Sequence, residues 1–244
     1  MDDGDKDGGD GGNGRGYDAT PYLPERGGLP AHRATARDCR GCPLYRDATQ
    51  TVFGEGTASA RLMMVGEQPG DKEDLDGEPF VGPAGRLLRK ALDEAGLADE
   101  KPYVTNAVKH FKYTPVRRAS GAKQRIHKPP TLREMSACRP WLAAELRLVG
   151  PEAVVALGAT AGRALLGPSF RVGPVRGTVL PLPAPDALGA PAPGDAAAGE
   201  GPGAPRAWPV PTVHPSSVLR ADDREAAYDA FVADLRVAAG LLRD

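Results

Sequence analysis

The fold is decided by residues 62–96, which read LMMVGEQPGDKEDLDGEPFVGPAGRLLRKALDEAG. The stretch opens with an uninterrupted apolar run at 62–65. It closes with a segment, 85–95, whose apolar residues recur at i, i+3 and i+4 before Gly96. The first pattern is typical of a strand that is buried on both faces, and the second of an amphipathic helix. The stretch therefore predicts a strand, a polar loop and a helix.

The same alternation continues along the rest of the chain. Three further apolar runs at 103–107, 153–157 and 209–213 predict buried strands. Helical patterns at 131–149, 159–166 and 222–242 lie among them, and Thr131 and Glu134 form a capping box at the start of the first. We therefore expect a three-layer α/β/α sandwich around a short, mainly parallel four-stranded sheet.

Composition limits how much of the chain can belong to this core. Glycine and proline together account for 56 of the 244 residues, and they concentrate in 1–30 and 183–206. Such segments bury too little apolar surface to offset the entropy of ordering. We expect a disordered tail over 1–30 and one domain over 31–244 with a flexible insert at 183–206.

Charge and cysteine content exclude several classes of protein. The formal net charge of −1 argues against a protein that coats nucleic acid or membranes by bulk charge. The N-terminus has no apolar h-region and no run of 18 apolar residues occurs, so we expect neither a signal peptide nor a membrane span. Three cysteines, an odd number, fit a reducing compartment. We expect a cytoplasmic monomer that does not bind membranes.

Polar residues gather where the predicted strands end. Glu67, Gln68 and Asp71 follow the first strand, Asn106 ends the second, and His214 follows the fourth. In open α/β sheets, ligands bind outside the carboxyl ends of the strands. These side chains are therefore expected to converge on one crevice.

From about Cys39 to Arg220 the chain resembles the iron–sulfur uracil-DNA glycosylases. The resemblance is carried by GEQPGDKEDLDGEPFVGPAGRLL at 66–88, YVTNAVKH at 103–110, CRPWL at 138–142, VVALGATAGRALLG at 154–167 and HPSSVLR at 214–220. Within this superfamily it is most similar to the X-type enzymes related to family 4, which carry an inserted basic loop with a histidine. That loop reads Lys-Gln-Arg-Ile-His at 123–127, and Gln124 departs from the arginine usual there.

The resemblance implies that the chain excises uracil from uracil-containing DNA. Asn106 would pair with uracil O4 and N3–H, Phe80 would offer a face to the ring, and His214 would donate to O2. Taken singly, these residues read as a turn or strand-end cap, a core aromatic and a structural histidine. The groups that would position water or stabilise the sugar cation are Glu67, Gln68 and Asp71. The further substrate-binding residues would be Arg125, Ser216 and Ser217. The acids could instead be solvated, with Asp71 capping a turn, and the serines could cap the turn after His214.

The resemblance also implies that His127 takes the sugar cation in place of water. Alkylated on one ring nitrogen and deprotonated on the other, an imidazole is a poor leaving group, so the adduct would persist. Glu67 is the candidate to orient His127 or to accept its proton. Without the resemblance, a lone histidine in a basic loop is a surface residue.

A basic segment surrounds this histidine. Nine lysines and arginines and no acids occur from Lys101 to Arg133. Such a run usually marks a solvated loop. Because it flanks the predicted crevice, we expect Arg117, Arg118, Lys123 and Lys128 to contact the DNA backbone.

A metal site is expected from Cys39, Cys42 and Cys138. The Cys-x-x-Cys spacing alone fits a redox pair or half of a zinc site. His110 stands where family 4 relatives carry a fourth cysteine, so the resemblance implies a [4Fe-4S] cluster with three cysteines and His110 as ligands. A three-cysteine cluster with an open iron and a Cys3His zinc site remain alternatives.

Three other functions compete with this assignment. One is a freely turning-over family 4-type glycosylase in which His127 only assists binding. Another is a non-catalytic, metal-bearing DNA-binding module. The third is a nucleotide-processing enzyme, which is disfavoured because GxxxxGK[ST] is absent and no GxGxxG lies between a predicted strand and a predicted helix.

Overall fold

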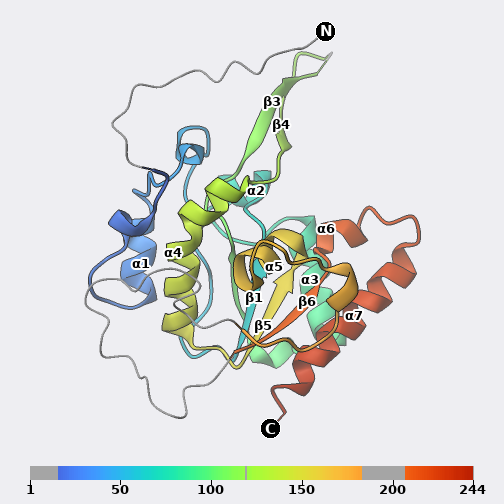
Figure 1. Cartoon of the computed structure of the whole chain (residues 1–244). Coiled ribbons are helices and arrows are strands. Elements are labelled where there is room, and N and C mark those ends of the chain that lie inside the picture. The colour runs from blue at the N-terminus through green and yellow to red at the C-terminus, as the bar shows by residue number, and fades with distance from the viewer. Residues whose placement is uncertain (1–15, 119, 183–206, 244) are drawn as a thin grey trace.

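The computed structural model describes residues 16–118, 120–182 and 207–243. At its centre lie four strands, β1 (Leu62–Gly66), β2 (Tyr103–Asn106), β5 (Ala153–Leu157) and β6 (Trp208–Thr212). They form a sheet in the order β2-β1-β5-β6, and every neighbouring pair is parallel (Figure 1). The predicted α/β fold with a short four-stranded sheet is confirmed.

Helices cover both faces of the sheet. They are α1 (Leu29–Ala36), α2 (Asp71–Asp76), α3 (Pro83–Glu94), α4 (Leu132–Val149), α5 (Gly158–Leu166), α6 (Pro215–Val218) and α7 (Arg224–Gly240), with 3-10 turns at Thr20–Tyr22, Pro43–Arg46, Ala98–Glu100 and Gly173–Val175. The predicted capping box at Thr131 is present, and α4 ends at Gly150 in the left-handed conformation. The unpredicted helix α2 begins with three acids in its first turn, which favour a helix N-terminus electrostatically.

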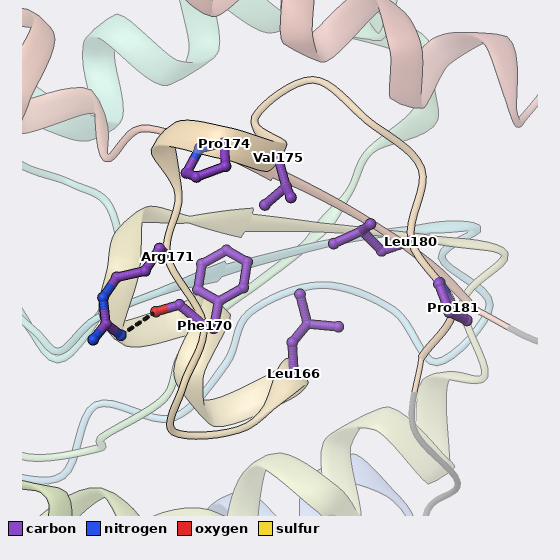
Figure 2. Close-up of a pocket in the computed structure, with 7 residues that line it drawn as sticks. All are labelled: Leu166, Phe170, Arg171, Pro174, Val175, Leu180 and Pro181. Atoms are coloured by element: carbon purple, nitrogen blue, oxygen red, sulfur yellow. Dashed lines mark hydrogen bonds between the residues drawn. The ribbon is translucent and has the colours of Figure 1, made fainter.

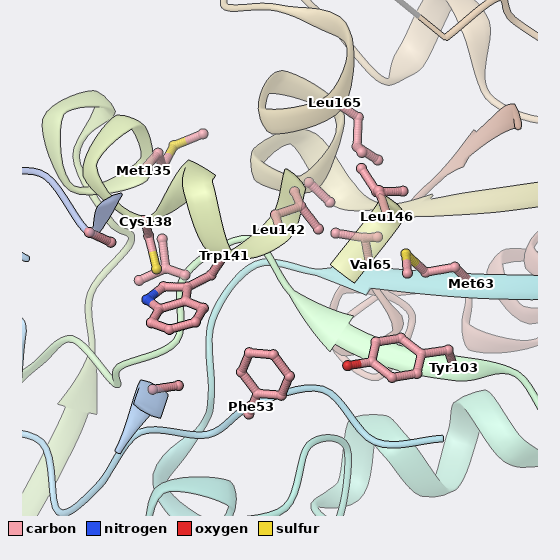
Figure 3. Packing of buried hydrophobic residues seen from close by; sticks show 14 of the residues in the cluster. Phe53, Met63, Val65, Tyr103, Met135, Cys138, Trp141, Leu142, Leu146 and Leu165 are labelled. Carbon is pink, nitrogen blue, oxygen red and sulfur yellow. The ribbon is translucent and has the colours of Figure 1, made fainter. Parts of the chain in front are cut away.

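Alternate residues of β1 point into two separate cores. Met63 and Val65 pack with residues of α4 and α5, including Trp141, whose ring meets Phe53 edge-on with centroids 5.8 Å apart (Figure 3). On the other face, Leu62 and Met64 pack with residues of α3 and α7. A strand buried on both faces needs this uninterrupted apolar sequence.

The basic segment, expected to be a loop, contains a two-stranded hairpin. Strands β3 (Tyr113–Arg117) and β4 (Lys123–His127) pair antiparallel and project from the body of the domain (Figure 1). The register pairs Tyr113 with His127 and Arg117 with Lys123, so these side chains share one face. The other face carries Val116 and Ile126, both exposed. Exposure of both apolar residues explains why the sequence showed no buried-strand pattern.

Residues 16–30 pack onto the domain, although the disordered tail was expected to extend to residue 30. Ala19 is 1% exposed, its amide donates to the Ala137 carbonyl at 2.9 Å, and α1 begins at Leu29. The Ala19 backbone lies close over Gly41, where any Cβ would overlap it. The expected tail at 1–15 and the insert at 183–206 lie outside the described residues. Within the described ranges, no helix is long and apolar enough to cross a membrane.

Candidate active site

The strand ends bring Asn106 and Phe80 together over Gly66. Gly66 and Asn106 are register partners at the ends of β1 and β2. A Cβ on Gly66 would collide with both the Asn106 side-chain oxygen and the Phe80 ring. Only glycine therefore leaves the two side chains room at this point.

Phe80 is held in an unusual backbone conformation. Its φ is +57°, in the left-handed region that side chains other than glycine rarely adopt, and the residue is buried. The Phe80 carbonyl accepts from Arg89 Nη1 at 3.1 Å, and Gly85 lets the helix backbone approach that carbonyl closely. Strain of this kind costs on the order of 1–3 kcal/mol and is typical of functional sites.

His214 faces the Phe80 ring as a neutral imidazole. The two rings stack with centroids 6.4 Å apart and an interplanar angle of 28°. Burial lowers the pKa of His214 to about 4. Its Nδ1 accepts the Ser216 main-chain N–H at 3.2 Å, so the single ring proton is on Nε2. The ring can therefore donate a hydrogen bond from Nε2 without carrying a charge.

The two serines after His214 bond to that residue. Ser216 Oγ lies 2.8 Å from His214 Nδ1, and Ser217 Oγ donates to the His214 carbonyl at 2.7 Å. These contacts hold His214 at the start of α6, and they match the turn-capping alternative considered for the serines.

Glu67, directly after β1, connects the hairpin to the sheet through its side chain. His127 Nε2 lies 3.1 Å from Glu67 Oε1, and Thr160 donates to the other carboxylate oxygen. Burial raises the pKa of the Glu67 carboxyl, but the hydrogen bonds from His127 and Thr160 outweigh burial and hold it below its usual range. The carboxylate is therefore ionised, and His127, half exposed, directs one ring nitrogen toward it.

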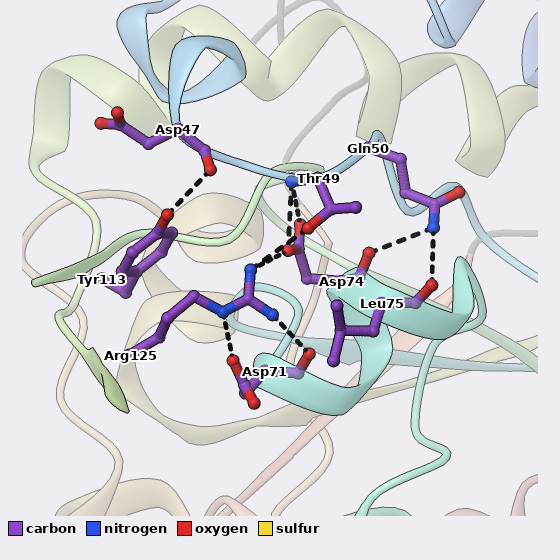
Figure 4. A network of polar contacts seen from close by, with 8 residues as sticks. All are labelled: Asp47, Thr49, Gln50, Asp71, Asp74, Leu75, Tyr113 and Arg125. Carbon is purple, nitrogen blue, oxygen red and sulfur yellow. Dashed lines mark hydrogen bonds and ion pairs between the residues drawn. The ribbon is translucent and has the colours of Figure 1, made fainter. Parts of the chain in front are cut away.

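Gln68, Asp71 and Arg125 anchor the hairpin. Gln68 Nε2 donates to the carbonyls of Lys112 and Lys128, at 3.1 and 3.0 Å, and so ties the two ends of the hairpin together. Arg125 donates to the Asp71 carboxylate and, at 2.6 Å, to Asp74 Oδ2 (Figure 4). The structure places these three predicted site residues at the base of the hairpin, where each bonds to protein groups.

The basic side chains expected at DNA lie on the outer part of this hairpin and at its end. Arg117, Arg118, Lys123 and Lys128 are all exposed, and Arg118 Nε donates to Gln124 Oε1 at 2.7 Å. Gln124, the residue that departs from the usual basic loop, thus contacts a neighbouring arginine.

The three cysteines belong to one buried cluster around α4. Trp141 Nε1 donates to Cys39 Sγ and the Lys109 amide to Cys138 Sγ, each at 3.3 Å. Burial raises the pKa of Cys42 to about 11 and also raises that of Cys138, so the thiols stay protonated unless a cation stabilises their thiolates.

His110 is available as a nitrogen ligand near these sulfurs. It lines a cavity of about 170 Å³ together with Cys39. Thr51 Oγ1 donates to the Ala36 carbonyl at 2.8 Å, so it accepts Nε2–H of His110 at 2.9 Å. Burial lowers the pKa of His110 to about 4, which leaves Nδ1 without a proton. The donor types suit iron or zinc, although no group of three such side chains stands in a metal-holding arrangement among the residues that the structure describes.

Comparison with known proteins decides the family. The model of the uracil DNA glycosylase superfamily matches residues 53–236. The chain belongs to the uracil-DNA glycosylase superfamily. A type-4 uracil-DNA glycosylase of Thermotoga maritima is 39% identical over 51% of this chain and 59% of its own length. A type-4 enzyme of Archaeoglobus fulgidus is 38% identical over 49% and 54%, and a type-5 enzyme of Pyrobaculum aerophilum 34% identical over 57% and 62%. The chain thus spans just over half the length of these curated relatives.

Two features of this candidate site were not predicted from the sequence. Thr160, which donates a hydrogen bond to Glu67, lies at the start of α5, just after strand β5. Its position after a strand end is the sequence signal that could have identified it. Asp74, which is fully buried and pairs with Arg125, lies in a run of acids that reads as solvated.

A separate pocket is lined by none of the strand-end residues described above. It has a volume of about 410 Å³ and is mainly apolar (Figure 2). Its lining residues are Leu166, Phe170, Arg171, Pro174, Val175, Leu180 and Pro181. None of them is a predicted site residue, and Arg171 Nη1 bonds the carbonyls of Ser169 and Phe170.

Proposed function

We propose that this chain excises uracil from DNA and that His127 then captures the exposed sugar carbon. The observation that carries the proposal is the contact between His127 and the ionised Glu67 at the edge of the strand-end crevice. A nucleophilic ring and a carboxylate beside the strand-end residues are the groups that attack at C1′ requires.

Base recognition is assigned to the residues that meet over Gly66. The Asn106 amide offers one donor and one acceptor, which match uracil O4 and N3–H and mismatch cytosine. Phe80 supplies an apolar face for a flipped ring. The strain at Phe80 supports a binding role, because a residue held at φ +57° must be kept there by its surroundings.

Bond cleavage uses His214 and Glu67. The C1′–N1 bond breaks with its electron pair going to uracil, and negative charge spreads to uracil O2. His214 donates from Nε2 to that oxygen, and as a neutral donor it keeps its proton. The Glu67 carboxylate stabilises the oxocarbenium-like sugar.

Capture completes the reaction. The ring nitrogen of His127 that does not face Glu67 forms the new bond to C1′. The proton on the other nitrogen passes to Glu67 or to water, so the product is a neutral substituted imidazole that leaves reluctantly. In the alternative, freely turning-over route, water attacks C1′ in place of His127, and similarity to type-4 enzymes fits this second candidate equally well.

We also propose that Cys39, Cys42, Cys138 and His110 hold a [4Fe-4S] cluster. The grouping of the sulfurs in one buried cluster and the unprotonated Nδ1 of His110 support it. When bound, the cluster would cross-link the N-terminal segment to α4.

The test is denaturing electrophoresis after mixing the protein with uracil DNA. Wild type is expected to give a species that survives SDS and heat, whereas thymine DNA gives none. His127→Ser should lose this species and retain some uracil release, while the matched neighbour Ile126→Ser should keep it. Normal release without a cross-link would favour the freely turning-over route, and absence of release would refute the glycosylase proposal.

A further inference from the structure

A fully buried ion pair lies beneath the base-recognition residues and has no part in the reaction steps above. Lys109 Nζ is 2.5 Å from Glu145 Oε2, and both side chains are 0% exposed. Burying two charges is costly unless every donor and acceptor is satisfied, and replacing such a pair by apolar residues often stabilises a protein. A role in function would explain why this site carries charges.

All three donors of the Lys109 ammonium are used. Besides Glu145, Nζ donates to Thr105 Oγ1 at 2.7 Å and to the Asn106 main-chain carbonyl at 2.8 Å. Glu145 in turn accepts from the Gly54 amide and the Tyr103 hydroxyl, each at 3.0 Å. The pair therefore connects helix α4 to the end of strand β2.

The Asn106 carbonyl needs this donor because β2 is an edge strand. Val104 bonds through both its N–H and its carbonyl to Glu55, on the side away from β1. Asn106, two residues further on, faces the same side, where no sheet strand follows. On the opposite side, Ala107 donates to the Gly66 carbonyl at 2.9 Å. The Asn106 peptide is thus fixed between β1 and the Lys109 ammonium.

We propose that Lys109 and Glu145 are positioning residues that hold Asn106 in register with the flipped base. The inference rests on the proposed uracil excision. A side-chain amide recognises a base only if its own backbone cannot tilt, and a misplacement of about 1 Å can cost about 100-fold in rate.

The test is the neutral double variant Lys109→Met/Glu145→Gln. The glutamine keeps an oxygen for Gly54 and Tyr103, so the main loss is the donor to the Asn106 carbonyl. Single-turnover uracil release is expected to fall about 10- to 100-fold, with affinity for uracil-free DNA unchanged. In an Asn106→Ala background the same double change should have almost no further effect, because positioning acts through that amide. Leu142→Ala, a cavity variant on the same helix, controls for lost stability and should leave the release rate of folded protein unchanged.

A second readout does not depend on catalysis. Hydrogen exchange over residues 103–110 of the DNA-free protein should be faster in the double variant than in Leu142→Ala. If the double variant does not fold, Glu145→Gln alone should give a smaller loss of release that again disappears with Asn106→Ala. Full additivity with Asn106→Ala, or wild-type release and exchange, would overturn the inference. A wild type that releases no uracil but whose variant exchanges faster would refute the proposed function and leave the positioning role standing.

Discussion

Arg125→Met should separate capture of the sugar from excision of the base. In the structure the guanidinium joins β4 to α2 through Asp71 and Asp74, and it lies over the rings of Phe111 and Tyr113 at 5.4 and 5.1 Å (Figure 4). Methionine keeps most of the stem but removes the charge and all the donors. Since His127 is two residues along the same strand, we expect the substitution to release the nucleophile from its place beside Glu67.

The magnitude follows from burial of the two acids. Asp71 is 55% exposed, so its ion pair contributes at most about 1 kcal/mol. Asp74 is 0% exposed, and without Arg125 its carboxylate keeps only the Thr49 amide among the residues that the structure describes, so the Arg125–Asp74 bond contributes about 1.5–3 kcal/mol. Gln68 still holds both ends of the hairpin. A net loss of about 1.5–3 kcal/mol corresponds to an adduct rate about 10- to 150-fold lower.

The assay is a single-turnover time course that follows both the SDS-resistant species and free uracil. Arg61→Met, which removes an arginine paired with Glu152 before the N-terminal ends of β1 and β5, is the matched control and should leave the adduct rate unchanged. In a His127→Ser background, Arg125→Met should leave uracil release unaltered. An Arg125→Met protein that forms adduct at the wild-type rate would refute the anchoring argument.

Four further outcomes are expected. Asn106→Ala should slow uracil release by about 100-fold or more without weakening binding to uracil-free DNA, and release at the parental rate would contradict the assignment. Because burial lowers the pKa of His214 from its ordinary 6.5 to about 4, the unfolded chain binds a proton between these values that the folded chain does not. The free energy of unfolding should therefore fall as the pH drops through this window, while His214-dependent release should persist until the pH nears 4; a pH–rate profile with an acid limb at 6.5 would argue against a neutral donor. Replacing Arg117, Arg118 and Lys123 with alanine should flatten the slope of log K against log salt by about 2 to 3, and an unchanged slope would place them away from phosphate. The purified protein should be brown, and metal analysis should find about four irons per chain; one zinc and no iron would favour the zinc site.

The sheet was predictable because burial on both faces leaves a simple record in sequence. All four apolar runs became strands, and the two glycines at 96 and 150 follow helix ends as expected. Position at strand ends also identified Glu67 and Asn106, since a parallel sheet brings these ends to one edge. Patterns of this kind depend only on local periodicity and on topology.

The hairpin and the contacts that anchor it could not be predicted from local periodicity or topology. A two-stranded ribbon without a core face of its own is exposed on one side, so Val116 and Ile126 give no sign of burial. Gln68 was assigned to positioning water or stabilising the sugar cation, and Arg125 to binding substrate, because polar residues expected near the strand ends suggest such roles. Their bonds to Lys112, Lys128 and the acids of α2 depend on where the hairpin docks, which requires contacts more than 40 residues apart in sequence.

The arrangement separates two tasks that depend on different parts of the molecule. Asn106 and His214 lie at strand ends of a sheet that packs against a core on each face. His127 lies on the projecting hairpin, which Gln68 and Arg125 anchor. In the proposed mechanism, recognition of the base and cleavage of its bond to the sugar need only the sheet, and capture of the sugar needs the hairpin as well. Because a pre-oriented nucleophile outcompetes water only while it is held near C1′, weakening the contacts that anchor the hairpin should favour attack by water. On this proposal, the same fold can support trapping or turnover, and the contacts that anchor the hairpin decide between them.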